Sequence, residues 1–156
     1  MISMSESDEE FHRKTARKCF NEAWDYLDKK NKNDGEERTM LHLAHASRYH
    51  WGLVGTPRNV AVGDWQISRI YASLNQPELA LQFAKSCLEI CEKNSLSDVL
   101  HTAYEAIARA YAISKDYGRA KDYLNRAREQ LTKLKLDKED RKAYSDQIRE
   151  TEQMLR

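Results

Sequence analysis

Two groups of polar side chains in this sequence have the types and spacing that chemistry requires. The first begins with His42 and His45, which are three residues apart. On a helix both imidazoles would project from one face, where they could hold a metal ion or act as a general acid and base. Three further side chains in the same segment extend this candidate polar cluster: Arg38, Arg48 and Tyr49.

The histidine pair lacks the rest of a metal-binding motif. The segment HLAH has no glutamate at the position where zinc-protease helices carry one. A third metal ligand would have to come from a distant segment, for example from His101, Asp64 or Glu105. We therefore predict no metal site and no cofactor. The cluster is expected to be a solvated helix face or, alternatively, a polar wall of a binding groove.

The second group is a pair of arginines, Arg69 and Arg109, which are 40 residues apart. Each guanidinium presents a planar fork of donors that fits a carboxylate or a phosphate. Two such forks on one surface would favour an anionic ligand. The alternative is that each arginine pairs with a neighbouring carboxylate of the chain, such as Glu105.

The two arginines belong to a pattern that occurs twice at the same offset. It comprises Ile67, Arg69, Tyr71, Ala72, Ala80 and Glu89, repeated as Ile107, Arg109, Tyr111, Ala112, Ala120 and Glu129. A period in this range is typical of proteins built from stacked helical repeats. The chemistry-bearing arginines are therefore expected on equivalent positions of successive repeats.

Composition and turn signals give the elements that must position these side chains. Only 5 Gly and 2 Pro among 156 residues predict a mostly helical chain. Gly, Pro, Asn and Asp clusters then divide the chain into segments of helix length. We expect a disordered N-terminus over 1–7 and a single domain over 8–156, divided into a degenerate helix pair (8–54), a repeat (57–94), a second repeat (98–134) and a capping helix (137–155).

Charge and hydropathy exclude several classes of partner. A net charge of +1 provides no overall field toward nucleic acid, so no nucleic-acid partner is predicted. No apolar run reaches the roughly 18–20 residues of a membrane span, and the acidic N-terminus does not read as a signal peptide. We expect a cytoplasmic protein in which Cys19, Cys87 and Cys91 fill the core, with a redox or metal pair at Cys87 and Cys91 as the alternative.

The two copies resemble the tetratricopeptide repeat, a unit of two antiparallel helices. The resemblance rests, in the second copy, on Tyr104, Ile107, Ala108, Tyr111, Ala120, Leu124 and Ala127. The first copy departs from the family pattern at Asp64, where a large aromatic residue is expected. The segment 42–109 also resembles an uncharacterised group of bacterial tetratricopeptide-like proteins.

This resemblance implies a right-handed superhelix whose concave surface is lined by the first helix of each pair. Partner peptides lie on that surface in the family. The positions implied here as a ligand or peptide groove are Trp65, Arg69, Ser73, Thr102, Glu105, Arg109 and Ala112.

Together these observations predict an all-α superhelix of about three helix pairs with a C-terminal capping helix. The predicted function is a non-catalytic adaptor that binds a protein or peptide segment, preferentially an acidic one, in the concave groove. The alternative is an enzyme that binds a small molecule or a metal around His42, His45 and the groove arginines. A homo-oligomer that uses the groove or an apolar helix face is a further alternative.

Overall fold

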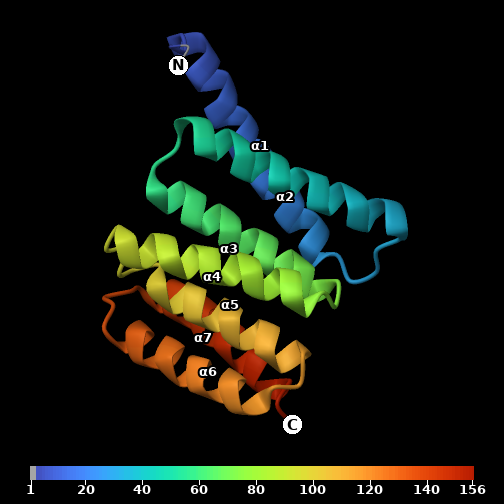
Figure 1. Cartoon of the computed structure of the whole chain (residues 1–156), viewed down its shortest axis with the longest axis vertical. Coiled ribbons are helices and arrows are strands. Elements are labelled where there is room, and N and C mark those ends of the chain that lie inside the picture. The colour runs from blue at the N-terminus through green and yellow to red at the C-terminus, as the bar shows by residue number, and fades with distance from the viewer. Residues whose placement is uncertain (1–2) are drawn as a thin grey trace.

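The computed structural model describes residues 3–156, and their regular secondary structure is entirely helical (Figure 1). The predicted all-α superhelix of helix pairs is confirmed. The seven helices are α1 (Glu6–Asp28), α2 (Asp34–Val54), α3 (Pro57–Ser73), α4 (Pro77–Lys93), α5 (Leu100–Ile113), α6 (Tyr117–Thr132) and α7 (Lys138–Gln153). Helix α1 begins two residues inside the segment expected to be disordered, because the Ser5 hydroxyl accepts a hydrogen bond from the Asp8 amide. Residues 1–2 of that segment lie outside the described part.

Consecutive helices pack as three pairs, α1 with α2, α3 with α4 and α5 with α6. The pairs stack in chain order, and α7 packs against both α5 and α6 at the far end (Figure 1). Contacts of α1 with α3, of α3 with α5 and of α5 with α7 place the first helix of each pair, together with α7, along one side. We call this the inner side of the superhelix.

The two turns inside the repeats have the same backbone conformation. Asn75 and Lys115 take positive φ values of 58° and 65°. In both turns the residue after this position donates its amide five residues back, Gln76 to the Tyr71 carbonyl and Asp116 to the Tyr111 carbonyl. This arrangement is a Schellman motif, which satisfies carbonyls that the helix end would otherwise leave free. The 40-residue repeat of the sequence is therefore also a repeat of local geometry.

Local capping residues start several helices. Thr56 and Asn59 form a capping box, with Pro57 in the first turn of α3. Asp137 caps α7 by accepting the Asp140 amide. Helix α5 begins at Leu100, two residues later than expected, because residues 97–99 form a turn that leads into it.

Small residues occur where helices cross, and aliphatic side chains fill the space between pairs. Ile67 and Ile107, which occupy the same repeat position, are both fully buried. Ala108 and Ala127 pack together with Leu124 and Ile148 in the core near the C-terminus. Cys87 and Cys91 lie in the core between α4 and the neighbouring helices as free thiols.

A buried carboxylate joins the first pair to the next. Asp64 of α3 is 2% exposed and accepts hydrogen bonds from Arg48 Nε of α2 at 2.8 Å and from Ser86 Oγ of α4 at 2.6 Å. The aliphatic part of Arg48 passes Gly63, where an added Cβ would lie 3.1 Å from Arg48 Cδ. This ion pair explains the departure from the repeat pattern at Asp64, because an aromatic residue there would leave Arg48 without its partner.

Candidate functional site

The inner side of the superhelix is hollowed along its length. Side chains of α1 and α7 line the hollow on opposite sides, while α3 and α5 contribute the residues between them. At the C-terminal ends of these helices, a cavity of ≈ 380 Å³ is lined by Leu27, Asp28, Arg69, Ala72, Ser73, Arg109, Ile113, Glu150 and Met154. We call the whole hollow the concave groove.

The middle of the groove is aromatic. Trp24 of α1 and Trp65 of α3 stack with ring centroids 5.4 Å apart and an interplanar angle of 28°. Beside them lies a second cavity of ≈ 380 Å³, lined by Phe20, Asn21, Trp24, Asp25 and Trp65. A flat apolar surface with polar groups at its rim is typical of sites that bind an apolar side chain of a partner.

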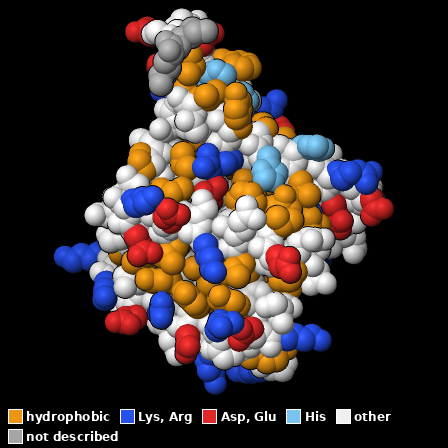
Figure 2. Space-filling model, viewed as in Figure 1, with side chains coloured by type: hydrophobic (Ala, Val, Ile, Leu, Met, Phe, Trp, Pro, Cys, Tyr) orange, Lys and Arg blue, Asp and Glu red, His pale blue; other side chains and the backbone are white. Residues whose placement is uncertain are grey.

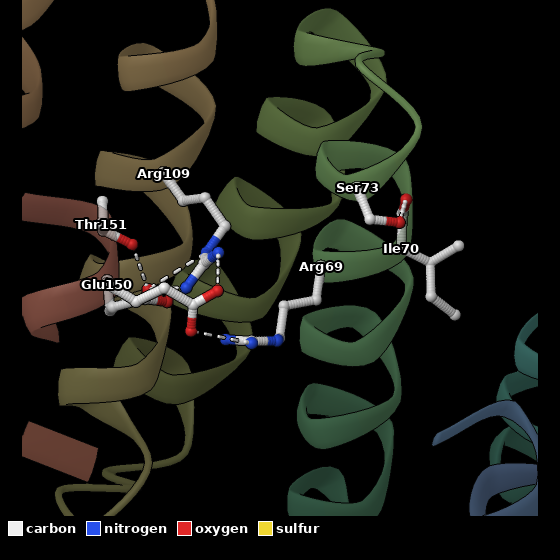
Figure 3. Close-up of polar contacts among 7 residues, drawn as sticks. Arg69, Ile70, Ser73, Arg109, Glu150 and Thr151 are labelled. Atoms are coloured by element: carbon white, nitrogen blue, oxygen red, sulfur yellow. Dashed lines mark hydrogen bonds and ion pairs between the residues drawn. The ribbon is translucent and has the colours of Figure 1, made fainter. Parts of the chain in front are cut away.

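Arg109 lies in a buried polar network rather than free in the groove. Its guanidinium donates from Nε and Nη2 to Glu105 Oε1, at 3.2 and 2.9 Å, and from Nη1 to Glu150 Oε1 at 3.3 Å (Figure 3). The Thr151 hydroxyl donates to the same Glu105 oxygen at 2.6 Å. Glu105 is 1% exposed and Arg109 6% exposed, so this network forms part of the contact between α5 and α7.

Arg69 makes fewer and longer polar contacts than Arg109, which occupies the same position in the second repeat. Its Nη2 lies 3.7 Å from Glu150 Oε2, and its Nη1 is buried without a hydrogen-bond partner. The guanidinium carbon lies 5.5 Å from the Trp24 ring centroid and 6.0 Å from that of Trp65, within cation–π range. Figure 3 shows Arg69 and Glu150 pointing toward one another across the groove.

The two arginines consequently differ in acidity. Burial, followed by the positive charge of Arg109, lowers the pKa of Arg69 below its ordinary value. Burial opposes the charge of Arg109 too, but the carboxylates of Glu105 and Glu150 raise the pKa of Arg109 above its ordinary value. Of these two arginines, Arg69 therefore has the less complete compensation of its charge.

The remaining predicted groove residues line separate parts of the hollow. Ser73 lines the same cavity as Arg69, and its hydroxyl donates to the Ile70 carbonyl at 2.6 Å (Figure 3). Thr102 is buried and lines a smaller cavity of ≈ 90 Å³ at the N-terminal ends of α3 and α5. That cavity also contains Trp65 and the Tyr144 ring of α7.

The residues of the predicted polar cluster on α2 contact different partners and do not form one site. His45 Nε2 lies 3.0 Å from the Tyr71 hydroxyl, and its ring packs edge-on against Phe83 of α4. Arg48 pairs with Asp64, and Tyr49 packs beside His50. The other two members, Arg38 and His42, are exposed. Within residues 3–156, no group of three or more His, Cys, Asp or Glu side chains is placed to hold one metal ion.

His101, considered in the sequence as a distant third ligand, is a buried packing residue. It is 2% exposed, and its ring centroid lies 4.5 Å from that of Tyr144. Burial is the main cause that lowers the pKa of His101 below 6.5. The folded state therefore holds a neutral imidazole that the unfolded chain would protonate in acid.

This burial predicts acid sensitivity of the fold. The contribution of His101 to stability is fully present above the unfolded pKa of about 6.5 and is lost as pH falls toward its lowered folded pKa. We expect the free energy of unfolding, measured by urea titration, to drop between pH 7 and pH 5 because of this residue. His101→Gln should flatten that dependence, whereas His42→Gln, at an exposed position, should leave it unchanged; equal slopes in all three proteins would contradict the prediction.

Sequence reasoning missed the groove residues that lie outside the two clear copies. Phe20 and Trp24 come from α1, and Tyr144 and Glu150 from α7. Trp24 lies outside the repeated pattern, so the sequence does not show which helix packs against it. Nothing local marks Glu150, because its partners are 41 and more residues away in sequence.

Comparison with protein families decides the nature of the repeated helix pairs. A model of the tetratricopeptide repeat matches residues 65–94 and 101–128. The chain contains two tetratricopeptide repeats. They coincide with α3–α4 and α5–α6, as the sequence resemblance predicted, while α1, α2 and α7 lie outside the matched segments. Comparisons with curated proteins and with solved structures gave no match.

The tetratricopeptide repeats suggest an adaptor that takes part in protein–protein interaction. In addition, no helix within residues 3–156 is both long and apolar enough to cross a membrane. Charged side chains of both signs are mixed over the face seen in Figure 2, without a large area of one sign.

Proposed function

We propose that the chain is a non-catalytic adaptor that holds a peptide segment of a partner protein in the concave groove. The observation that carries this proposal is the stacked pair Trp24–Trp65 beside a cavity of ≈ 380 Å³. The two rings come from different helices, so the fold positions them without a bound partner. A preformed aromatic surface costs little conformational entropy on binding and is the kind of site where binding energy concentrates.

In this proposal, Arg69 gives the groove its preference for an anionic ligand. Arg109 is buried and each of its three guanidinium nitrogens already donates to Glu105 or Glu150, so its charge is compensated within the chain. Arg69 keeps a buried nitrogen without a partner, and its contact with Glu150 is long. A carboxylate of the partner could displace the half-exposed Glu150 and pair with the Arg69 fork.

The proposed peptide therefore has two features. An aromatic or aliphatic side chain fills the cavity beside Trp24 and Trp65, and an acidic group follows it toward Arg69. These features lie within one stretch of the groove, because Arg69 is itself in contact range of both indole rings.

Selection from a display library of random peptides on the purified protein tests the proposal. Enriched peptides should carry an apolar anchor with a nearby acidic residue. Trp24→Ala should weaken their binding by about tenfold or more, since a central aromatic contact is typically worth 1–2 kcal/mol. Asn21→Trp, which fills the cavity from an exposed position on its rim, should have the same effect without removing the stacked pair.

Two further variants separate the parts of the site. Arg69→Ala should weaken binding of acidic peptides more than that of their amide analogues, and this difference should shrink at high salt. Tyr117→Ala, at an exposed aromatic residue of α6 outside the groove cavities, is the matched control and should bind as the parent protein does. Failure to enrich any peptide, or loss of binding in Tyr117→Ala but not in Trp24→Ala, would overturn the proposal.

A further inference from the structure

The end of the molecule where α1 begins carries a pair of histidines that the concave groove does not use. His12 of α1 and His50 of α2 face one another with their Nδ1 atoms 2.8 Å apart. Their ring centroids are 5.0 Å apart and the ring planes are inclined by 31°. The residues are 38 positions apart in sequence, so only the packing of α1 on α2 brings them together.

We propose that His12 and His50 form a chelating site for a divalent transition-metal ion of the zinc or nickel type. Two imidazole nitrogens bound to one such ion lie about 2.0–2.1 Å from it. At the bond angles of tetrahedral or square coordination, these nitrogens are then about 2.8–3.4 Å from each other. The observed separation of 2.8 Å falls at the lower edge of this range, so the ion requires a small widening of the pair and a rotation of the rings that turns both Nδ1 lone pairs toward it.

The chemistry of the pair suits metal binding. With both imidazoles neutral, one Nδ1–H donates to the Nδ1 lone pair of the other ring. When both Nδ1 atoms bind an ion, the donor ring moves its proton to Nε2, so no net proton is released. Burial, followed by the proximity of His12, lowers the pKa of His50, which favours the neutral form that a metal requires.

The surroundings leave the pair accessible from one side. Both histidines are partly exposed, and the rings of Phe11 and Tyr49 pack edge-on against them. These two aromatic residues are 61% and 64% exposed. Figure 2 shows histidine and hydrophobic side chains side by side at this end of the molecule. Water completes the coordination of the ion, since within residues 3–156 no third ligating side chain joins the pair.

Titration of the untagged protein with ZnCl₂ or NiCl₂ alone tests the site, read by calorimetry and by thermal unfolding. One ion should bind per chain and should raise the melting temperature by about 2–5 °C at saturation, because it joins α1 to α2 only in the folded state. MgCl₂ should do neither, since Mg²⁺ prefers oxygen ligands.

Single substitutions identify the ligands. His12→Gln and His50→Gln should each weaken binding by at least about tenfold, because one of the two chelating bonds is lost. His42→Gln, an exposed histidine on the same helix α2, is the matched control and should keep parental affinity. Circular dichroism checks that each variant is folded. Absence of binding below about 1 mM, or equal affinity in the parent, His12→Gln and His50→Gln, would overturn the inference.

Discussion

Replacing Arg109 with alanine is expected to lower the free energy of unfolding by about 3–5 kcal/mol, because Glu105 would keep its charge in a buried site with no cation. Glu105 is 1% exposed, and Arg109 supplies two of the three hydrogen bonds that its Oε1 accepts. Chemical denaturation followed by circular dichroism measures the loss. The same change also frees Glu150, so α7 should detach more readily than the rest of the chain.

The matched control for this prediction is Arg119→Ala. Arg119 also pairs with a nearby carboxylate, that of Asp116 at the N-cap of its helix, but its side chain is 68% exposed. An exposed pair contributes little, so the loss should stay within about 1 kcal/mol. Replacing both members of the buried pair, Arg109→Met with Glu105→Leu, should recover much of the stability. A small effect of Arg109→Ala alone would contradict the prediction.

The contrast between Arg69 and Arg109 shows that the same position in two repeats does not predict the same side-chain contacts. Both arginines occupy the same position of their repeats, and the sequence predicted two equivalent cations. The residue four positions earlier differs, however: it is Trp65 for Arg69 and Glu105 for Arg109. Residues four apart on a helix are neighbours, so one arginine gains a salt bridge and the other an aromatic surface. This difference was readable in the sequence, where Glu105 had been recognised as an alternative partner.

The helix boundaries and the turns inside the repeats have local causes. The capping box at Thr56 and Asn59 and the paired turns at Asn75 and Lys115 depend on residues within a few positions of each other. The groove depends on contacts between helices far apart in the chain. Trp24 lies 41 positions before Trp65, and Glu150 lies outside the repeats, so no periodicity relates either to its partner. The fold could therefore be predicted more completely than the site.

The same limit applies to the first helix pair, which the family model does not match although α1 contributes Trp24 to the groove. A buried polar contact, the Asp64 carboxylate held by Arg48 and Ser86, joins it to the repeats beside an apolar cluster that α1, α2 and α3 share. From the sequence, Asp64 was considered only as a missing aromatic residue and as one possible distant metal ligand. Its role becomes apparent when α2, α3 and α4 are seen together.

Asp64→Ala should accordingly lower the free energy of unfolding by about 2–4 kcal/mol, since it leaves Arg48 without its carboxylate in a largely covered position. Arg48 is 31% exposed and can partly reach water, which places the effect below that of Arg109→Ala. The first pair should also become more sensitive to limited proteolysis in the segment between α2 and α3. Peptides selected on the groove should bind this variant less tightly, because Trp24 would no longer be held against Trp65.

Ser86→Ala is the matched control, because it removes one hydrogen bond to Asp64 and leaves the ion pair in place. Its cost should be about 1 kcal/mol, with proteolysis unchanged. If Asp64→Ala and Ser86→Ala lose the same small amount, packing alone attaches the first pair to the repeats. If Asp64→Ala behaves as expected, the aspartate at this position explains why a helix pair without the repeat's sequence pattern still continues the superhelix and completes the groove.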